Sequence, residues 1–131
     1  MTRSANLTRR DFIAAGVAGS LAFSSIPQAR GVSANDKINV ACIGVGGRGG
    51  ANLRTISGTG EVNVVALCDV NSRNLGKAAE QHSKARTYTD FRKLYETTND
   101  IDAVVVSTTE HTHAFATLPA LRLGKPVYCE K

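Results

Sequence analysis

The most constraining feature of this sequence is a glycine-rich run directly after a short apolar segment. Residues 38–43 read INVACI, and residues 44–49 read GVGGRG, which fits the spacing G-x-G-x-x-G. In such a run the first glycine permits a tight turn, the second lets a pyrophosphate approach the backbone, and the third lets the next helix pack closely on the strand. The N-terminus of that helix attracts phosphate groups. The run therefore indicates a dinucleotide site, although the motif alone is a weak signal.

An acidic residue strengthens this interpretation. Asp69 follows a second apolar run, residues 62–68, and lies 20 residues after Gly49. A carboxylate in this place can accept hydrogen bonds from both hydroxyls of an adenosine ribose. It would repel a 2′-phosphate, which favours NAD, whereas Arg73 leaves NADP open. The alternatives are a glycine-rich loop without a ligand and a methyltransferase loop that binds another adenosine cofactor; the order of strand, glycines, helix, strand and acid favours a dinucleotide.

Apolar and amphipathic segments alternate from Lys37 onward. We expect strands at 38–43, 62–68, 85–88, 101–107 and 126–129, and helices at 49–57, 72–82, 91–97 and 113–123. Strands rich in Val and Ile that are separated by helices predict right-handed βαβ crossovers. The fold class is therefore α/β, with a doubly wound parallel sheet of the Rossmann type that ends after its fifth strand.

Single residues predict several helix ends. Asp90, and either Asn71 or Ser72, suit helix starts, and Gly124 suits a helix end. Pro119 lies inside the last expected helix, where it removes a backbone hydrogen bond and predicts a kink or a shortened helix.

The first 34 residues resemble a twin-arginine export signal. Residues 8–13 read TRRDFI and precede an uncharged stretch up to residue 26, which is too short for a stable membrane anchor. Residues 32–34, VSA, offer small side chains to a signal peptidase, with residues 27–29, PQA, as a second choice. We therefore expect a signal peptide over 1–34, a domain over 35–131, and an exported or periplasmic protein. The alternative is a chance arginine pair on a disordered or amphipathic N-terminus.

The charge does not indicate nucleic-acid binding. The chain carries a net charge of +5, but residues 1–34 hold four Arg and one Asp, which leaves +2 for the other 97 residues. Basic and acidic residues are interspersed there, so no basic patch is expected for DNA or RNA.

The three cysteines, Cys42, Cys68 and Cys129, lie within or at the end of apolar strand runs. We expect them to be buried free thiols. Because the sequence has no C-x-x-C pair and no Cys/His cluster, it predicts no zinc site. Parallel neighbouring strands rarely have disulfide geometry, so Cys42 and Cys68 are not expected to pair.

Five segments resemble the Rossmann domain of one oxidoreductase family, typified by glucose-fructose oxidoreductase and myo-inositol 2-dehydrogenase (Gfo/Idh/MocA). They are CIGVGGRGG at 42–50, ALCDV at 66–70, YTDFRKL at 88–94, IDAVVVSTTEHTHAFA at 101–116 and GKPVYCEK at 124–131. The Glu-Lys pair at the end is the most specific of these elements. A departure is Thr109, where the family usually has proline.

The resemblance implies roles for particular residues. The cofactor would be contacted by Gly44, Gly46, Gly47, Arg48, Gly49, Asp69, Ser107, Thr108, His113 and Glu130. Glu130 would lie near the nicotinamide, and Lys131 would be catalytic, contacting the substrate hydroxyl and helping its deprotonation. His111 and His113 flank Thr112 on an expected loop, but no carboxylate or cysteine completes a metal site there.

The resemblance also implies a second, α+β substrate domain that residues 1–131 do not contain. The full-length protein would be an NAD(P)-dependent dehydrogenase of sugars, inositols or related polyols and a homo-oligomer, and the present chain alone would be marginally stable and inactive. Two alternatives stay open: an NAD-dependent glycoside hydrolase of the same superfamily, and a non-enzymatic dinucleotide-binding fragment.

Overall fold

The computed structural model describes residues 37–131, so the predicted export signal at 1–34 lies outside the described residues. The described part contains a five-stranded sheet with the order β3-β2-β1-β4-β5. Its strands are β1 (Ile38–Ile43), β2 (Val62–Cys68), β3 (Arg86–Tyr88), β4 (Ala103–Val106) and β5 (Val127–Cys129), and all neighbouring pairs are parallel. The predicted doubly wound α/β fold is confirmed.

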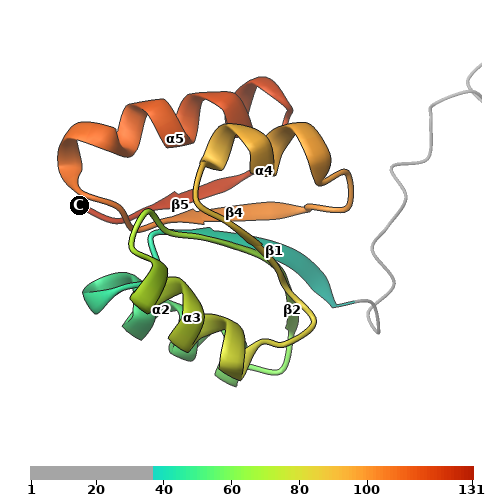
Figure 1. The fold of residues 1–131 in the computed structure, drawn as a ribbon. Helices are drawn as coiled ribbons and strands as arrows, with labels where there is room; N and C mark the ends of the chain where they lie inside the picture. The colour runs from blue at the N-terminus through green and yellow to red at the C-terminus, as the bar shows by residue number, and fades with distance from the viewer. Residues whose placement is uncertain (1–36) are drawn as a thin grey trace, which may run out of the picture. The chain divides into compact units, whose positions relative to one another are not determined.

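Two helices cover each face of the sheet (Figure 1). They are α2 (Gly47–Gly58) and α3 (Ser72–Gln81) on one face, and α4 (Phe91–Thr97) and α5 (Glu110–Arg122) on the other. Each helix connects two parallel strands, as the alternation of apolar and amphipathic segments predicted.

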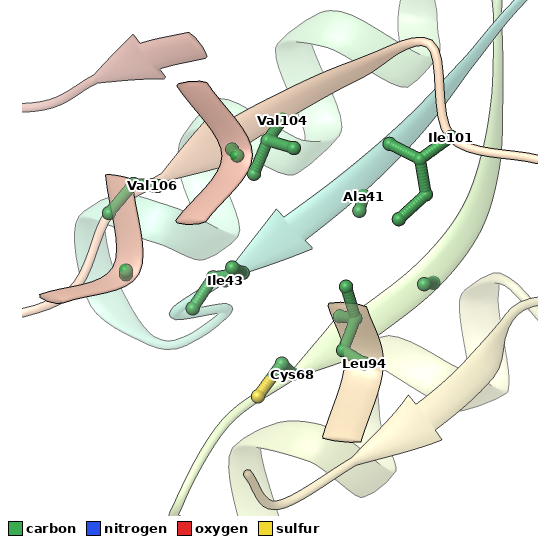
Figure 2. Packing of buried hydrophobic residues seen from close by; sticks show 10 residues of the cluster. Ala41, Ile43, Cys68, Leu94, Ile101, Val104 and Val106 are labelled. Carbon is green, nitrogen blue, oxygen red and sulfur yellow. The ribbon is translucent and has the colours of Figure 1, made fainter. Parts of the chain in front are cut away.

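The two faces of the sheet bury separate cores. Ile43, Leu94 and Val106 belong to the core beneath α4 and α5, where Figure 2 shows them among Ala41, Ile101 and Val104. Val40, Leu53 and Leu75 belong to the core beneath α2 and α3. Because β1 contributes alternate residues to both cores, its sequence is an almost continuous apolar run rather than an alternating one.

The predicted caps of α3 and α4 are confirmed. The side chain of Asn71 accepts hydrogen bonds from Arg73 N and Asn74 N, and that of Asp90 accepts one from Arg92 N. These bonds satisfy N–H groups that have no partner within the first helical turn.

Helix α5 differs from its prediction at its start and in its interior. It begins at Glu110, three residues early, because Thr109 adopts an extended conformation and its carbonyl accepts a hydrogen bond from Thr112 N at 2.9 Å. His111 therefore lies on the helix instead of on a loop, and His113 lies within its first turn instead of at its start. The helix also continues through Pro119 to Arg122, so of the two predicted effects of Pro119 the shortening is wrong, while the kink stays a prediction. The Pro119 carbonyl still accepts from Leu123 N at 3.1 Å, and Gly124, with φ +70°, follows the helix end as expected.

The cysteines are free, but only two of the three are buried. Cys42 faces α2 and α3, whereas Cys68 faces α4 and α5, so the sheet itself separates them. Cys129 is exposed, which corrects its expected burial, because β5 is the last strand of the described sheet.

Large apolar side chains are exposed near β5. On and just after α5 these are Phe115, Leu118, Leu121 and Leu123, and on β5 it is Tyr128. Among the helices of residues 37–131, none has the length and apolar character needed to cross a membrane.

Candidate dinucleotide site

The sheet has one place where the direction of strand order reverses, between β1 and β4. The chain proceeds from β1 to β2 and β3 on one side, and then crosses to β4 and β5 on the other. Loops at the carboxyl ends of β1 and β4 therefore diverge, and α/β proteins bind ligands in the crevice between such loops. The glycine run follows β1, and Ser107 and Thr108 follow β4.

The glycine loop has the tight geometry that its sequence predicts. Gly44 has φ +81°, a conformation that favours glycine, and a Cβ added there would lie 2.6 Å from the Ser107 carbonyl oxygen. A Cβ added to Gly49 would lie 2.8 Å from the Gly44 carbonyl carbon and closer still to its oxygen. The first glycine thus serves the turn, and the third allows α2 to pack against the end of β1.

Asp69 lies at the carboxyl end of β2, beside this loop. Its Oδ2 accepts hydrogen bonds from Val45 N at 2.9 Å and Gly46 N at 3.1 Å, and its Oδ1 accepts one from Asn71 N at 2.8 Å. The carboxylate thereby connects the glycine loop to the start of α3. It also lines a hollow of about 420 Å³ together with Gly44, Gly46, Ser107 and Thr108.

The end of β4 forms the opposite wall of the hollow. Ser107 N donates to the Ile43 carbonyl at 2.8 Å, which keeps the two strand ends together. The Thr108 hydroxyl is buried and has no hydrogen-bond partner within the described part of the chain. A buried polar atom without a partner is costly unless a ligand or water supplies one.

These features fit a dinucleotide. The hollow lies within the size range of small-molecule sites, and its wall combines a loop that excludes Cβ atoms, a carboxylate and an unpartnered hydroxyl. The Asn74 amide lies against Gly46, at the place where a Cβ would be, so this side chain borders the approach to the second glycine.

Glu130 follows β5 and joins the site from the side of α2. Its Oε2 accepts from Asn52 Nδ2 at 2.9 Å, and more weakly from Arg48 Nε and Tyr128 OH at 3.4 Å each. The hydrogen bond from Asn52, with a smaller contribution from the Arg48 guanidinium, holds the pKa of Glu130 below its usual value. The Glu130 side chain is only 13% exposed, whereas that of Arg48 is 73% exposed. Lys131, the predicted catalytic residue, is the next residue and is exposed.

The two histidines of α5 take different positions. His113 Nε2 lies 2.8 Å from the Thr108 carbonyl oxygen, so the ring ties the helix to the end of β4. His111, and not His113, is among the residues that line the hollow. A direct cofactor contact for His113 therefore stays a prediction. Residues 37–131 hold no cluster of three His, Cys, Asp or Glu side chains that would suit a metal ion.

Sequence reasoning missed two residues of this site, Asn52 and Asn74. Asn52 lies four positions after Arg48, and residues with this spacing share one face of a helix. This spacing could have predicted that Asn52 lies on the same side of α2 as Arg48, the side that faces Glu130.

A larger hollow, of about 790 Å³, lies at the amino ends of the strands, lined by residues such as Asn39, Val62 and Arg86. An ion pair between Arg86 and Asp100 borders it. It contains neither a glycine loop nor a strand-order reversal, so its volume alone does not make it the better candidate.

The family described as "Oxidoreductase family, NAD-binding Rossmann fold" (GFO_IDH_MocA) matches residues 38–131. The chain belongs to this family. The match covers all five strands and the glycine loop, so the predicted family resemblance of this segment is confirmed.

Known proteins resemble the chain over most of its length or over its Rossmann segment. A glycosyl hydrolase family 109 protein of Stenotrophomonas maltophilia is 34% identical, over 95% of this chain and 29% of that protein. The crystal structure of myo-inositol 2-dehydrogenase from Lactobacillus plantarum is 30% identical with a TM-score of 0.68, over 73% of this chain and 28% of that one. That of scyllo-inositol dehydrogenase from Lactobacillus casei, with bound NAD(H) and scyllo-inositol, is 25% identical with a TM-score of 0.67, over 73% and 28%. The chain thus spans less than a third of the length of these relatives.

Proposed function

We propose that this chain is the NAD-binding part of an oxidoreductase that acts on an inositol, a sugar or a related polyol. The observation that carries the proposal is the position of Asp69, whose carboxylate binds the glycine loop and lines the hollow at the strand-order reversal. The inositol dehydrogenases among its relatives support the substrate class.

Each residue of the site has a chemical task in this proposal. The glycine loop and the N-terminus of α2 bind the pyrophosphate, and Asp69 accepts a hydrogen bond from the adenosine ribose and disfavours a 2′-phosphate. The neutral amine of Lys131 takes up the proton of the substrate hydroxyl, and the ammonium group formed in this way stabilises the negative charge left on that oxygen. A bound nicotinamide would supply the acceptor for the hydride.

Calorimetric titration of the chain with NAD and with NADP tests the cofactor part. We expect NAD to bind more tightly than NADP. The protein expressed from its intact gene should then reduce NAD in the presence of myo-inositol, scyllo-inositol or another polyol of a small panel. Absence of binding by either dinucleotide would contradict the proposal, whereas binding of NAD without any turnover would favour the non-enzymatic alternative.

An NAD-dependent glycoside hydrolase is the second candidate, because a glycosyl hydrolase family 109 protein is 34% identical over 95% of this chain. Such an enzyme releases nitrophenol from nitrophenyl glycosides without net formation of NADH. A dehydrogenase forms NADH and releases no nitrophenol. Both products can be followed in one reaction, by absorbance at two wavelengths.

We also propose export by the twin-arginine pathway, based on Arg9 and Arg10 before the uncharged stretch that ends at residue 26. Fractionation of cells that express the intact gene should place the protein in the periplasm. The double variant Arg9→Lys with Arg10→Lys should keep it in the cytoplasm, and an unchanged distribution would contradict the proposal. The homo-oligomer that the family resemblance implies can be tested on the same exported protein by light scattering.

A further inference from the structure

One amide group of α2 joins the ends of two strands. The nitrogen Nδ2 of Asn52 donates one hydrogen bond to Ser107 Oγ at 3.0 Å and another to Glu130 Oε2 at 2.9 Å. Ser107 follows β4, and Glu130 follows β5. A side-chain amide has two N–H donors, so both are used here.

The bond from Asn52 is the main side-chain contact that orients Glu130. The other two donors, Arg48 and Tyr128, lie at 3.4 Å, and the Arg48 side chain is 73% exposed. Exposed ion pairs of this kind contribute little because solvent screens them and the long side chain loses entropy. The Glu130 backbone is held separately, by the bond from its N–H to the Val106 carbonyl at 2.8 Å. Backbone and carboxylate of Glu130 are thus fixed from two sides, one of which is Asn52.

We propose that Asn52 is a positioning residue: its bond to the Glu130 carboxylate, together with the bond from Glu130 N–H to the Val106 carbonyl, sets the direction in which the chain leaves β5 and so positions Lys131. This inference rests on the proposed function, because it gives Asn52 a purpose only if Lys131 acts on a substrate. Both N–H donors of the Asn52 amide are taken by Ser107 and Glu130, so in this proposal its task is orientation and not cofactor binding. Its bond to Ser107 connects the same amide to the wall of the hollow, so α2, β4 and β5 keep one relative arrangement.

Glu130 provides a readout that does not depend on activity. The pKa of this carboxyl is lowered first by the hydrogen bond from Asn52. In Asn52→Ala the bond is lost, and in Asn52→Asp a carboxylate of the same shape faces Glu130. The pKa of Glu130, followed by NMR at its carboxyl carbon, should move to higher pH in both variants, and further in Asn52→Asp because the new negative charge disfavours the ionised form.

The control is Asn63→Asp, which makes the same change at the amino ends of the strands. The Asn63 amide donates to Asn39 Oδ1 at 3.2 Å, far from Glu130. This variant should leave the Glu130 titration where it is in the unsubstituted chain. An unchanged Glu130 titration in both Asn52 variants would overturn the inference, whatever the activity.

Kinetics of the protein expressed from its intact gene complete the test. We expect Asn52→Ala to lower kcat about tenfold or more, while the KM for NAD changes less than about threefold, because misplacement of a catalytic group slows the chemical step. A kcat within twofold of the unsubstituted protein would overturn the positioning role alone. Failure of the unsubstituted protein to turn over any polyol would instead overturn the proposed function, and the inference with it.

Discussion

The carboxylate of Asp69 holds the backbone N–H of Val45, which lies 24 residues earlier in the chain, at 2.9 Å. The same oxygen accepts from Gly46 N, and the other oxygen accepts from Asn71 N. A carboxylate has about four acceptor positions, so three of them already serve the protein. Asp69 therefore shapes the glycine loop. In this arrangement one acceptor position, on Oδ1, is left for a ribose hydroxyl, whereas its place in the sequence predicted hydrogen bonds to both hydroxyls.

Replacement of Asp69 by Asn should weaken NAD binding and reduce the preference for NAD over NADP. The amide turns one acceptor oxygen into a donor that cannot accept from a backbone N–H, and it removes the charge that opposes a 2′-phosphate. Hydrogen bonds to charged groups contribute about 1.5–3 kcal/mol, so we expect the Kd for NAD to rise about ten- to hundredfold. Calorimetric titration measures both dinucleotides. The control is Asp100→Asn, which changes a carboxylate at the amino ends of the strands, beside Arg86. A Kd for NAD within twofold in Asp69→Asn would contradict the assignment.

Gly49 and Gly76 should respond oppositely to the same substitution. A methyl group at Gly49 would collide with the Gly44 carbonyl, whereas at Gly76, inside α3, nothing lies within 4 Å. Gly49→Ala should lower the free energy of unfolding by about 1–3 kcal/mol or more, because the backbone of the turn cannot move away. Gly76→Ala should raise it by about 0.4–1 kcal/mol, because alanine is the better helix former and restricts the unfolded chain. Urea denaturation distinguishes them, and equal effects of either sign would argue against the close approach of α2 to β1.

The sheet was predictable because both of its faces are buried. The apolar runs of β1 and β2 have no polar residue that faces a core, so their bounds follow directly from the sequence. The start of α5 was less predictable, since Thr108, Thr109 and Thr112 are all of a type that favours helix starts, and the sequence does not single out Thr109 among them.

The candidate site also has a part that could be predicted from the sequence and a part that could not. The glycine loop and Asp69 could be predicted because each acts through its own backbone or its place at a strand end. The contact between Asn52 and Glu130 joins residues 78 positions apart, and it exists only because β5 brings its end next to α2. The exposure of Cys129 likewise depends on β5 being the last strand of the described sheet, which its own residues do not reveal.

The three thiols should react at very different rates. Burial raises the pKa of both Cys42 and Cys68 to about 12, with Asp69 and Asp90 adding to the effect at Cys68. At pH 8 both thiols are therefore almost entirely un-ionised, and the thiolate is the reactive form. Ellman's reagent should therefore detect one fast thiol in the folded chain, the exposed Cys129, and all three after unfolding in urea.

Cys129→Ser supplies the control for this assignment, because it should remove the fast reaction and leave the two slow thiols. Fast reaction of a second thiol in the folded chain would show that one of the two cores opens readily. In that case the burial of Cys42 or Cys68 between the sheet and its helices would be in error.

Asp90 should make the stability of the chain fall more steeply with decreasing pH. Its carboxylate caps α4 by accepting from Arg92 N at 2.9 Å, and it also accepts from the Arg92 guanidinium at distances of 2.8 to 3.1 Å. These bonds lower its pKa from the ordinary 3.8 to about 2. Because the pKa is lower in the folded state, the ionised group stabilises the fold above about pH 4, and this contribution is lost as the pH falls toward 2.

The measurement is thermal unfolding of the chain and of Asp90→Asn between pH 2 and pH 6. Asn is itself a good capping residue, so the variant keeps the bond to the backbone but loses the charge that titrates. The difference in Tm between the two proteins should be largest near pH 6 and shrink below pH 4, since protonation makes the unsubstituted chain resemble the variant. A difference that stays constant over this range would mean that Asp90 stabilises α4 by its shape alone, and that its contact with the Arg92 guanidinium does not persist in solution.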